Sequence, residues 1–461
     1  MSDRITRLLA GYANSVVAEG LPEQTAHEVK RRVLDSIGVA VAGLDGDAPG
    51  VGRAYAAELP DPNGATIWCS GLRANPEVAG FANGVAVRYL DFNDTYLSKE
   101  PLHPSDVIAP LIALAERRGR PANDLMAAIA TAYEVSVTLC DAASLRTHGW
   151  DHVNYIGIGV ACAAGQLLRL SVEKIEHAVA IATVPHAAMR ETRAGELSKW
   201  KGAAAANAAR NAVFATHLAE KGMTGPARPF EGEMGFVRQV LDGEGFHEEV
   251  LSRLEAKPPP RRILDTHIKY WPVEYHAQSA VDAALQFPET FLHDADAIKS
   301  VEIDTFDAAY QIIAKDPEKW DPRTRETADH SLQYIVVAAL LDDEVTSRTF
   351  EPERFREPRT LDILKERVTV REDPELSDGY PEGIPNRITV TTTGGDREVR
   401  EVRHPRGHAR NPMTDEEVVA KYRRNVEGRL DADRMTAIER LVWDLEQSSV
   451  RELTRPLAEP R

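Results

Sequence analysis

Cysteine is scarce in this sequence, and its three copies, Cys69, Cys140 and Cys162, lie far apart without a C-x-x-C pair. Disulfides are therefore not expected, and the scarcity is typical of a reducing compartment. Structural zinc sites and iron–sulfur clusters need closely spaced thiolates, so the spacing supports neither. We predict that the protein uses no metal and no cofactor.

An excess of basic residues is also absent, because 55 Lys and Arg face 72 Asp and Glu, a formal net charge of −17. This balance argues against a nucleic-acid partner, and an anionic ligand would need a local cationic pocket. No uncharged apolar stretch approaches the roughly 20 residues of a membrane span. Residues 1–13 also lack the apolar core of a signal peptide. We therefore expect a cytoplasmic protein without a membrane partner.

The 461 residues, with 43% apolar and 28% charged, have the composition of a globular protein of two or three domains. Apolar residues recur at helical spacing through most of the first half of the chain. Several of these segments are apolar nearly all round, as are helices buried inside an all-α domain. The pattern predicts helices at about 4–19, 22–43, 105–118, 122–145, 153–168, 171–183 and 199–221.

The pattern changes after Lys257-Pro258-Pro259-Pro260, which reads as a stiff linker. Strand-like segments follow at 300–305, 367–371, 387–393 and 398–402, with helical patterns at 276–287 and 329–342. Thr414 and Glu417 then form a capping box that opens C-terminal helices. We predict a mainly α protein with an α+β part. A large helical domain (1–265) would be completed by 396–461, with a smaller α+β lid domain (266–395) inserted between them.

One polar stretch, RYLDFNDTYLSKEPLHPSD (88–106), interrupts two apolar helical segments. Its candidates for chemistry are Asp91, Asp94, Thr95 and His103. The acidic residues here also suit turns and helix caps. Burying such polar side chains between apolar helices is costly, however, unless they have partners or a ligand. We therefore predict that this loop forms one wall of an active site.

A second stretch, Ser198-Lys199-Trp200-Lys201-Gly202, precedes an Ala-rich helix. If Ser198 caps that helix, both lysines lie in its first turn, where the macrodipole disfavours cations. A bound carboxylate would remove the conflict; the alternative is two solvated lysines. Arg190 and Arg193, just upstream, would extend the same cationic wall.

Further candidates are scattered along the chain. His148 and His152 lie within about one turn and indicate a polar pocket, although two histidines are too few for a metal site. Lys269 and His276 follow the proline linker, where a cleft between two domains would close. Tyr334 lies in an apolar helix and either donates a proton or fills the core.

Together these stretches resemble the MmgE/PrpD family, the cluster-free 2-methylcitrate dehydratases and their relatives. The resemblance covers nearly the whole chain and implies a homodimer with the architecture predicted above. It implies active-site residues at Asp91, Thr95, His103, His152, Lys201, Lys269, His276 and Tyr334. The motifs that carry it are LDSIGVAVAG (34–43), FANGVAVRYLDFNDTYLSKEPLHPSD (81–106), WKGAAAANAARN (200–211), KYWPVEYHAQSA (269–280), DHSLQYIVVAALLD (329–342), YPEGIPNRITV (380–390) and GHARNPMT (407–414).

The implied reaction is the removal of water from 2-methylcitrate, or citrate, without an iron–sulfur cluster. It needs a base, an acid for the leaving hydroxyl, and cations that stabilise an enolate-like charge. We expect Lys201 and Lys269 to bind carboxylate, and His103, oriented by Asp91, to transfer the proton. The expected acid is Tyr334 or His152, and the expected substrate-binding residues are Thr95, Lys269, His276, Arg190 and Arg193.

Three other readings stay open. The family includes cis-aconitate decarboxylases and an epimerase, although the DFNDTYLSKEP form of the loop is closer to the dehydratases. An isoprenoid-type enzyme would use Asp91 and Asp94 to hold magnesium pyrophosphate, but it needs a second Asp-rich helix, which the sequence lacks. A non-catalytic helical scaffold would leave the placement of Lys201 and His103 unexplained.

Overall fold

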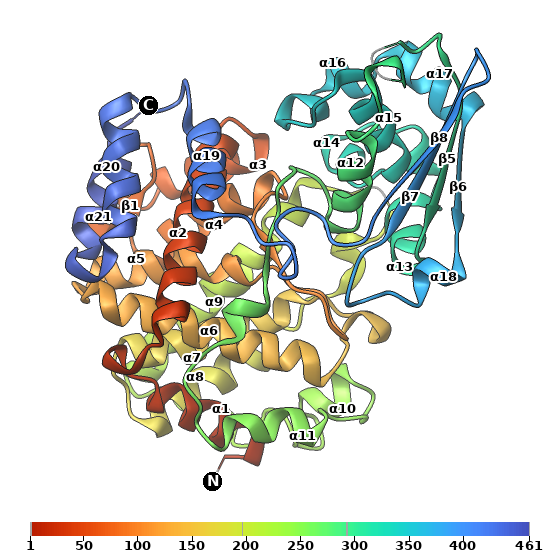
Figure 1. Cartoon of the computed structure of the whole chain (residues 1–461). Helices are drawn as coiled ribbons and strands as arrows, with labels where there is room; N and C mark the ends of the chain where they lie inside the picture. The colour runs from red at the N-terminus through yellow and green to blue at the C-terminus, as the bar shows by residue number, and fades with distance from the viewer. Residues whose placement is uncertain (1, 196, 292–293, 461) are drawn as a thin grey trace.

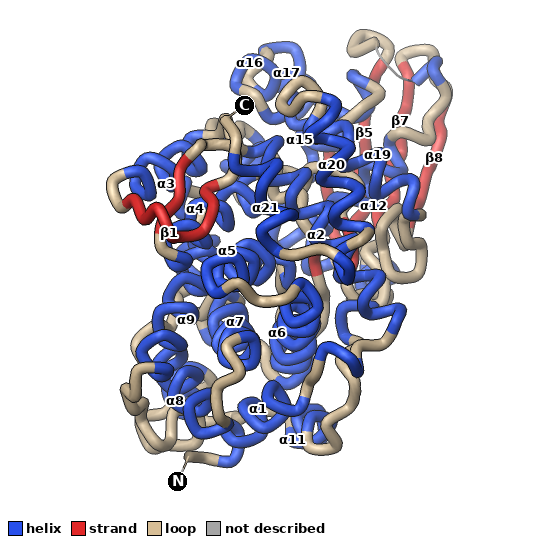
Figure 2. Tube along the Cα trace, turned by 90° about the vertical axis from the view of Figure 1, so that its left-hand side faces the viewer, coloured by secondary structure: helices blue, strands red, loops and turns tan. Residues whose placement is uncertain are grey.

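Apolar residues at helical spacing build a large helical lobe from the N-terminal part of the chain (Figure 1). The computed structural model describes residues 2–195, 197–291 and 294–460. Strands β1 (Pro60–Ile67) and β2 (Leu72–Ala74) form an antiparallel arm, seen in red beside α3 in Figure 2. The helices are α1 (Arg4–Ser15), α2 (Glu23–Gly43), α3 (Asp47–Ala57), α4 (Pro76–Tyr89), α5 (Ile108–Arg118), α6 (Ala122–Ala142), α7 (Val153–Leu167), α8 (Val172–Thr183), α9 (Ala204–Glu220), α10 (Phe236–Val240) and α11 (Glu248–Leu251).

Helices α6 and α7 form the interior of this lobe, as their nearly continuous apolar sequence predicts. Helix α7 contacts both α6 and α9. A Cβ atom on Gly159 of α7 would lie 2.0 Å from the Ser136 hydroxyl oxygen of α6, so only glycine fits this close approach. Among the described residues, α6 alone has the length and hydropathy of a membrane span, and 94% of its apolar window is buried inside the protein. In this structure α6 is a core helix.

The α+β lobe (residues 275–402) is built on a four-stranded sheet ordered β6-β5-β7-β8. Strand β5 runs parallel to β6 and antiparallel to β7, and β7 is antiparallel to β8. Helices α12, α15 and α17 pack on the sheet, which lies on the side of the lobe away from the helical lobe (Figure 1). The elements are α12 (Gln278–Ala284), β5 (Ile298–Thr305), α13 (Asp307–Ala309), a π-helical turn (Tyr310–Ala314), α14 (Arg325–Ala328), α15 (Leu332–Asp342), α16 (Pro352–Phe355), α17 (Pro358–Arg367), β6 (Val368–Glu372), α18 (Pro374–Ser377), β7 (Asn386–Thr392) and β8 (Arg397–Val402).

After β8 the chain returns to the helical lobe through α19 (Asp415–Val426), α20 (Ala432–Trp443) and α21 (Val450–Ala458). The predicted capping box is present at the start of α19. Helix α19 packs on α2, and α21 packs on α5 and β1, so the two ends of the chain share one lobe (Figure 1). The predicted fold class, a helical part made from both ends with an inserted α+β part, is confirmed.

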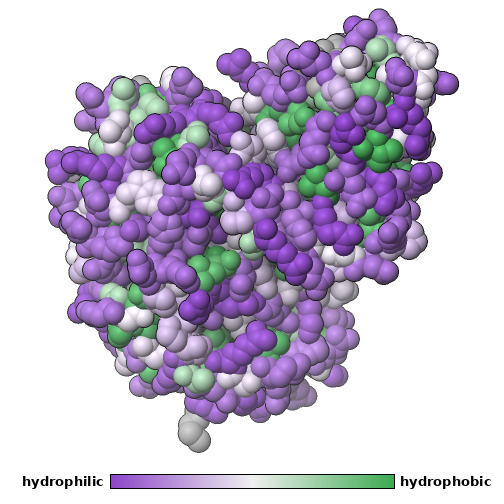
Figure 3. All heavy atoms as spheres, viewed as in Figure 1, coloured by the Kyte–Doolittle hydropathy of each residue, from purple (hydrophilic) through white to green (hydrophobic). Residues whose placement is uncertain are grey.

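The predicted domain limits at 265 and 395 stay predictions. Strand β8 concerns the limit at 395. It pairs with β7 from Arg397 to Val402, so the sheet continues past residue 395. The face shown in Figure 3 is largely hydrophilic, and its hydrophobic residues form small separate groups, as is common on protein surfaces.

Candidate active site

The loop after α4 is tied by a short ladder to the segment that leads into the α+β lobe. Strand β3 (Asp94–Thr95) pairs antiparallel with β4 (His267–Ile268). The ladder carries Lys269 toward Asp91, whose backbone lies in the left-handed region with φ 49°. Aspartate tolerates this conformation better than most residues. The local backbone thus explains how two residues distant in sequence come into contact.

Asp91 is a buried charge centre shared by cations from three parts of the chain. Its carboxylate lies 2.5 Å from Arg88 Nη1, 2.6 Å from Lys269 Nζ and 2.9 Å from Lys201 Nζ. His330 Nε2 of the α+β lobe lies 3.3 Å away. Burial alone would raise the pKa of Asp91, but Arg88, Lys201 and Lys269 outweigh it and hold that pKa well below its usual value. Asp106 lies 3.9 Å from Arg88 Nε as a further carboxylate near this group. Asp91 thus gathers three cationic side chains at one place, an arrangement that suits an anionic ligand.

His103 is held by the backbone of the same loop. Its Nδ1 lies 2.8 Å from the carbonyl oxygen of Asp94. If Nδ1 carries the proton, Nε2 is the free base. Burial and then the charges of Arg88 and Lys269 lower the pKa of His103 well below its usual value, which keeps the ring neutral at neutral pH. The prediction that Asp91 orients His103 is wrong, because the oxygens of Asp91 face cations and the Asp94 carbonyl takes that place.

His152 stands beside His103, with ring centroids 5.6 Å apart. Its Nδ1 lies 3.2 Å from Asp151, which also binds Arg193 at 3.1 Å. Burial, followed by the charge of Arg193, lowers the pKa of His152 to about 3. Asp151 itself keeps a lowered pKa, because Arg193 and His152 outweigh the effect of its burial. His152 is therefore a neutral ring at neutral pH.

Two more histidines come from the α+β side. His276 Nδ1 lies 2.8 Å from Glu274, and His330 Nδ1 lies 2.5 Å from Asp329. Burial and the nearby Lys201 lower the pKa of His330. Each of the four histidines thus has an oxygen within 3.2 Å of Nδ1, and in His103, His276 and His330 this contact is a hydrogen bond that fixes the ring and leaves Nε2 for other contacts.

These residues line one cavity of about 330 Å³ between the two lobes, a volume in the range of small-molecule sites. Several buried nitrogens in its wall have no hydrogen-bond partner among the described residues: Arg88 Nε, Arg146 Nε, His152 Nε2, Arg193 Nη2 and His276 Nε2. Buried polar atoms are normally satisfied, so this group of unpartnered nitrogens indicates a ligand site. The lining includes Arg88, Asp91, Thr95, His103, Arg146, His152, Arg190, Arg193, Lys201, Glu274, His276, Lys315, Lys319 and His330.

Two predicted site residues have other positions. Tyr334 is buried in the α+β lobe, where its hydroxyl donates to the Thr349 carbonyl at 2.5 Å and its ring packs on Phe350. The prediction of a catalytic Tyr334 is therefore corrected, because its proton is committed to the protein backbone. Lys269 lies behind Asp91 and also donates to the Asp91 carbonyl at 2.8 Å, so its charge acts on the cavity through Asp91.

The predicted cap at Ser198 is also corrected. Helix α9 begins at Ala204, and a separate 3-10 turn, Lys199–Gly202, precedes it. Lys201 is buried against Asp91, whereas Lys199 is exposed and lies 2.6 Å from Asp47. The buried partner of Lys201 is thus a protein carboxylate.

Several residues of the cavity wall were not among the predicted site residues. Arg88 and His330 lie inside motifs that carry the family resemblance, but other residues of those motifs were the predicted ones. Glu274 stands two positions before His276 and was not considered as its partner. Arg146 and Lys319 had no local signal, because only the tertiary fold brings them to the cavity.

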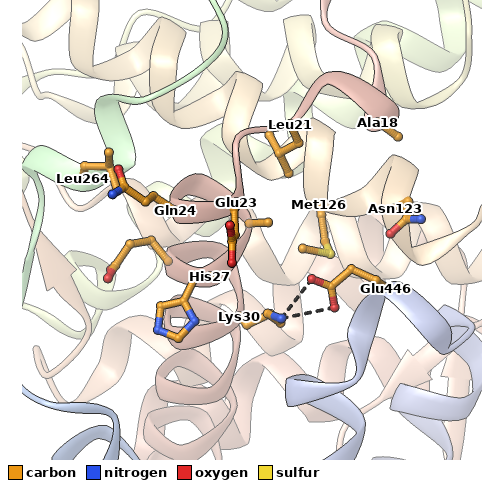
Figure 4. A pocket seen from close by; sticks show the side chains of 12 residues that line it. Ala18, Leu21, Glu23, Gln24, His27, Lys30, Asn123, Met126, Leu264 and Glu446 are labelled. Carbon is orange, nitrogen blue, oxygen red and sulfur yellow. Dashed lines mark hydrogen bonds and ion pairs between the residues drawn. The ribbon is translucent and has the colours of Figure 1, made fainter.

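A second cavity, of about 870 Å³, lies between α2 and the C-terminal segment (Figure 4). Lys30 and Glu446 form an ion pair of 2.9 Å across it. Its other charged residues are mainly acidic, with Glu23 and Glu28 in the lining. The cationic lining and the unpartnered donors identify the smaller cavity as the candidate site. Within the described ranges, no group of three or more His, Cys, Asp and Glu is arranged to hold a metal ion.

A cationic cavity with four oriented histidines defines an acid–base site for a small polyanion. The chain belongs to the MmgE/PrpD family, whose N-terminal domain matches residues 7–249 and whose C-terminal domain matches residues 271–447.

Relatives cover nearly the whole chain. The 2-methylcitrate dehydratase of Cupriavidus necator is 29% identical over 92% of this chain and 89% of its own length. The 2-methylcitrate dehydratase of Escherichia coli K12 is 28% identical, over 86% and 84%. The cis-aconitate decarboxylase of Mus musculus is 28% identical, over 100% and 94%.

Proposed function

We propose that this protein is a hydro-lyase of the 2-methylcitrate dehydratase type. It removes water from 2-methylcitrate, and from citrate as a second substrate, to give a cis-aconitate-type product without an iron–sulfur cluster. The observation that carries the proposal is the cavity itself, which combines unpartnered cationic donors with histidines fixed at Nδ1. The names of the dehydratase relatives support this choice of substrate.

Substrate binding rests on the arginines at the helical side of the cavity. Arg146, Arg190 and Arg193 lie together in the lining. Burial and the neighbouring charge of Arg146 contribute to a lowered pKa of Arg190, as expected where cations are gathered without full compensation. A bidentate carboxylate would satisfy such guanidinium groups. We assign one substrate carboxylate to this wall and a second to Lys201 and Arg88 beside Asp91.

The proposed reaction begins when His103 Nε2 takes a proton from the carbon beside a carboxylate. The electron pair of that C–H bond forms the carbon–carbon double bond, and the C–O bond to the adjacent carbon breaks. The hydroxyl takes a second proton and leaves as water. Lys201 and Arg88 stabilise the charge that develops on the carboxylate during proton removal. Lys269 supports them from behind by holding Asp91 in place.

A second candidate function is decarboxylation of cis-aconitate. The mouse relative with that name covers the whole of this chain. The same wall would hold the substrate, but carbon dioxide would leave in place of water. The scaffold reading, by contrast, gives no reason for unpartnered buried donors in a cavity.

The deciding experiment incubates the purified protein separately with 2-methylcitrate, citrate and cis-aconitate and identifies products by NMR. We expect the dehydration product from 2-methylcitrate and no release of carbon dioxide. Carbon dioxide from cis-aconitate without any hydration product would favour the decarboxylase. A melting temperature unchanged by all three compounds would support a scaffold, because a ligand that binds the native state raises it.

We further propose that the enzyme works as a homodimer in the cytoplasm, with a small tricarboxylate as its partner and neither nucleic acid nor membrane. Family resemblance motivates the dimer, and the few cysteines motivate the compartment. Light scattering of the purified protein tests the homodimer, and a mass equal to one chain would contradict it. Cell fractionation tests the cytoplasmic location.

A further inference from the structure

We propose that His276, held by Glu274, donates the proton to the leaving hydroxyl, so that the acid of the reaction comes from the α+β lobe and the base from the helical lobe. This inference rests on the proposed dehydration. It gives His276 a catalytic role where substrate binding alone was predicted. It also makes Glu274 a positioning residue.

The contact between the two residues is specific. The Glu274 carboxylate accepts from the His276 backbone N–H at 2.7 Å and lies 2.8 Å from the ring Nδ1. The Glu274 backbone N–H donates to the Asp329 carbonyl at 2.9 Å. Burial alone would raise the pKa of Glu274, but His276, His330 and Lys269 outweigh it and lower that pKa to about 2. Glu274 is therefore a fixed carboxylate at neutral pH.

The His276 ring has little freedom to turn. It packs against the stacked pair of Phe306 and Tyr380, with centroid distances of 5.4 and 5.7 Å to the two rings. Asn386 of β7 donates to the His276 carbonyl at 2.9 Å and fixes its backbone. His276 is 2% exposed and lines the cavity, and within the part of the chain that the structure describes its Nε2 has no hydrogen-bond partner. Nε2 is thus the ring atom left for a substrate oxygen.

The environments of the histidines favour different roles. The carboxylate at Nδ1 of His276 forms no ion pair with an arginine among the described residues, whereas Asp151 beside His152 is shared with Arg193 and Asp329 beside His330 is shared with Arg325. The Nε2 atom of His330 also already faces Asp91.

His103 has a backbone carbonyl at Nδ1, and its pKa is lowered well below the usual value by burial and nearby cations. His152, with a pKa of about 3, is neutral at neutral pH and holds no proton at Nε2 if Asp151 fixes the proton at Nδ1. Pairs of titratable groups with opposed environments are typical of acid and base partners.

The proton balance is simple. His276 gives its Nε2 proton to the hydroxyl as the C–O bond breaks, and His103 holds the proton taken from carbon. Each ring returns to its starting state by exchange with solvent once water and product leave. The nearest charged group to the His276 ring is Glu274, from the same turn of the chain. Lys269 and His330 lie close enough to lower the pKa of Glu274. Tyr380, from the segment before β7, faces the His276 ring.

The leaving group gives the sharpest test, because fluoride needs far less help from an acid than hydroxide. The experiment compares 2-methylcitrate with 2-fluorobutane-1,2,3-tricarboxylate in the wild type and in His276→Gln. We expect water elimination to fall by about 10²–10⁴-fold, with fluoride release within about tenfold of wild type. Equal loss with both compounds would assign His276 to binding and overturn the proposal. His404→Gln is the matched control, because His404 Nε2 also lacks a partner among the described residues but lies outside the cavity lining.

Glu274→Gln tests the positioning role. We expect kcat for water elimination to fall by about 10–100-fold with KM little changed, and fluoride release to stay within about tenfold of wild type. The double variant with His276→Gln should be no slower than His276→Gln alone. Equal losses with the two substrates, or additive losses in the double variant, would overturn the role of Glu274.

A readout without turnover keeps this inference separate from the proposed function. NMR of ¹⁵N-histidine-labelled protein follows the hydrogen bond between His276 Nδ1 and Glu274 directly. We expect the ring nitrogen signals of His276 to change in Glu274→Gln, because the ring loses its carboxylate partner, and to stay unchanged in His404→Gln. If no polycarboxylate loses water, the proposed function fails, while these signals still decide whether Glu274 holds the ring.

Discussion

Lys269 Nζ lies 2.6 Å from the Asp91 carboxylate and 2.8 Å from the Asp91 carbonyl oxygen, so one lysine fixes both the side chain and the backbone of the central loop. Asp91 is in turn the buried counter-charge for Arg88 and Lys201. The stability of the site and its affinity for anions therefore depend on the same carboxylate.

Replacing Asp91 by Asn should destabilise the protein strongly. Three buried cations would lose the carboxylate that they share, and breaking a buried ion pair costs about 3–5 kcal/mol. The free energy of unfolding, from urea denaturation, measures the loss. Asp47→Asn is the matched control, because Asp47 pairs with Lys199 at 2.6 Å on the exposed surface, where an ion pair contributes little to stability. Equal effects of the two changes would contradict the charge centre.

His103→Asn should preserve the fold and abolish most of the activity. The Asn side chain can still donate to the Asp94 carbonyl, but it supplies no basic nitrogen. Loss of a general base lowers kcat by about 10²–10⁴-fold. Steady-state kinetics and circular dichroism together separate catalysis from folding. The exposed His247 gives a control variant, His247→Asn, with wild-type kcat expected; a His103 variant that keeps most of its kcat would exclude it as the base.

Much of this arrangement was predictable from the sequence, because helical periodicity and the proline linker separate the helical and α+β segments. Asp91, Thr95 and His103 of the loop at 88–106, together with Lys201, His152 and His276, were predicted as site residues and do meet in one cavity. The Asp94 carbonyl oxygen that holds His103 was not predictable, because every residue has a backbone carbonyl and the sequence does not show which one is used. Tyr334 was misplaced because an apolar helix can bury a tyrosine hydroxyl on any nearby carbonyl, here that of Thr349. Arg146 was not predictable either, because only the tertiary fold brings it to the cavity.

Lys421 of α19 should couple the C-terminal helices to the site. Its Nζ lies 2.7 Å from Asp35, and it donates to the backbone carbonyls of Phe92 at 2.8 Å and Lys269 at 2.7 Å. Lys421→Met leaves Asp35 as an unpaired buried charge, so we expect a loss of about 3–5 kcal/mol in the free energy of unfolding.

The double variant Asp35→Asn with Lys421→Met should lose less stability than the sum of the single variants, because neither charge is then left alone. Urea denaturation of the four proteins gives the coupling energy. Strict additivity would show that the two residues act independently and that the link to the loop is not electrostatic.

His152 should make stability fall as the pH is lowered below the ordinary pKa of histidine. Burial, and then Arg193, lower its folded pKa to about 3, while in the unfolded chain it takes up a proton near pH 6.5. Between these values the unfolded state binds more protons, so stability is full above the unfolded pKa and declines with falling pH. Roughly one pH unit below the unfolded pKa, near pH 5.5, this residue alone costs about 1.4 kcal/mol relative to about pH 7.5. His152→Asn removes the titrating ring, so the difference in unfolding free energy between the two pH values should shrink by about that amount. An unchanged difference would mean that His152 is protonated in the native state and does not supply a neutral ring to the cavity.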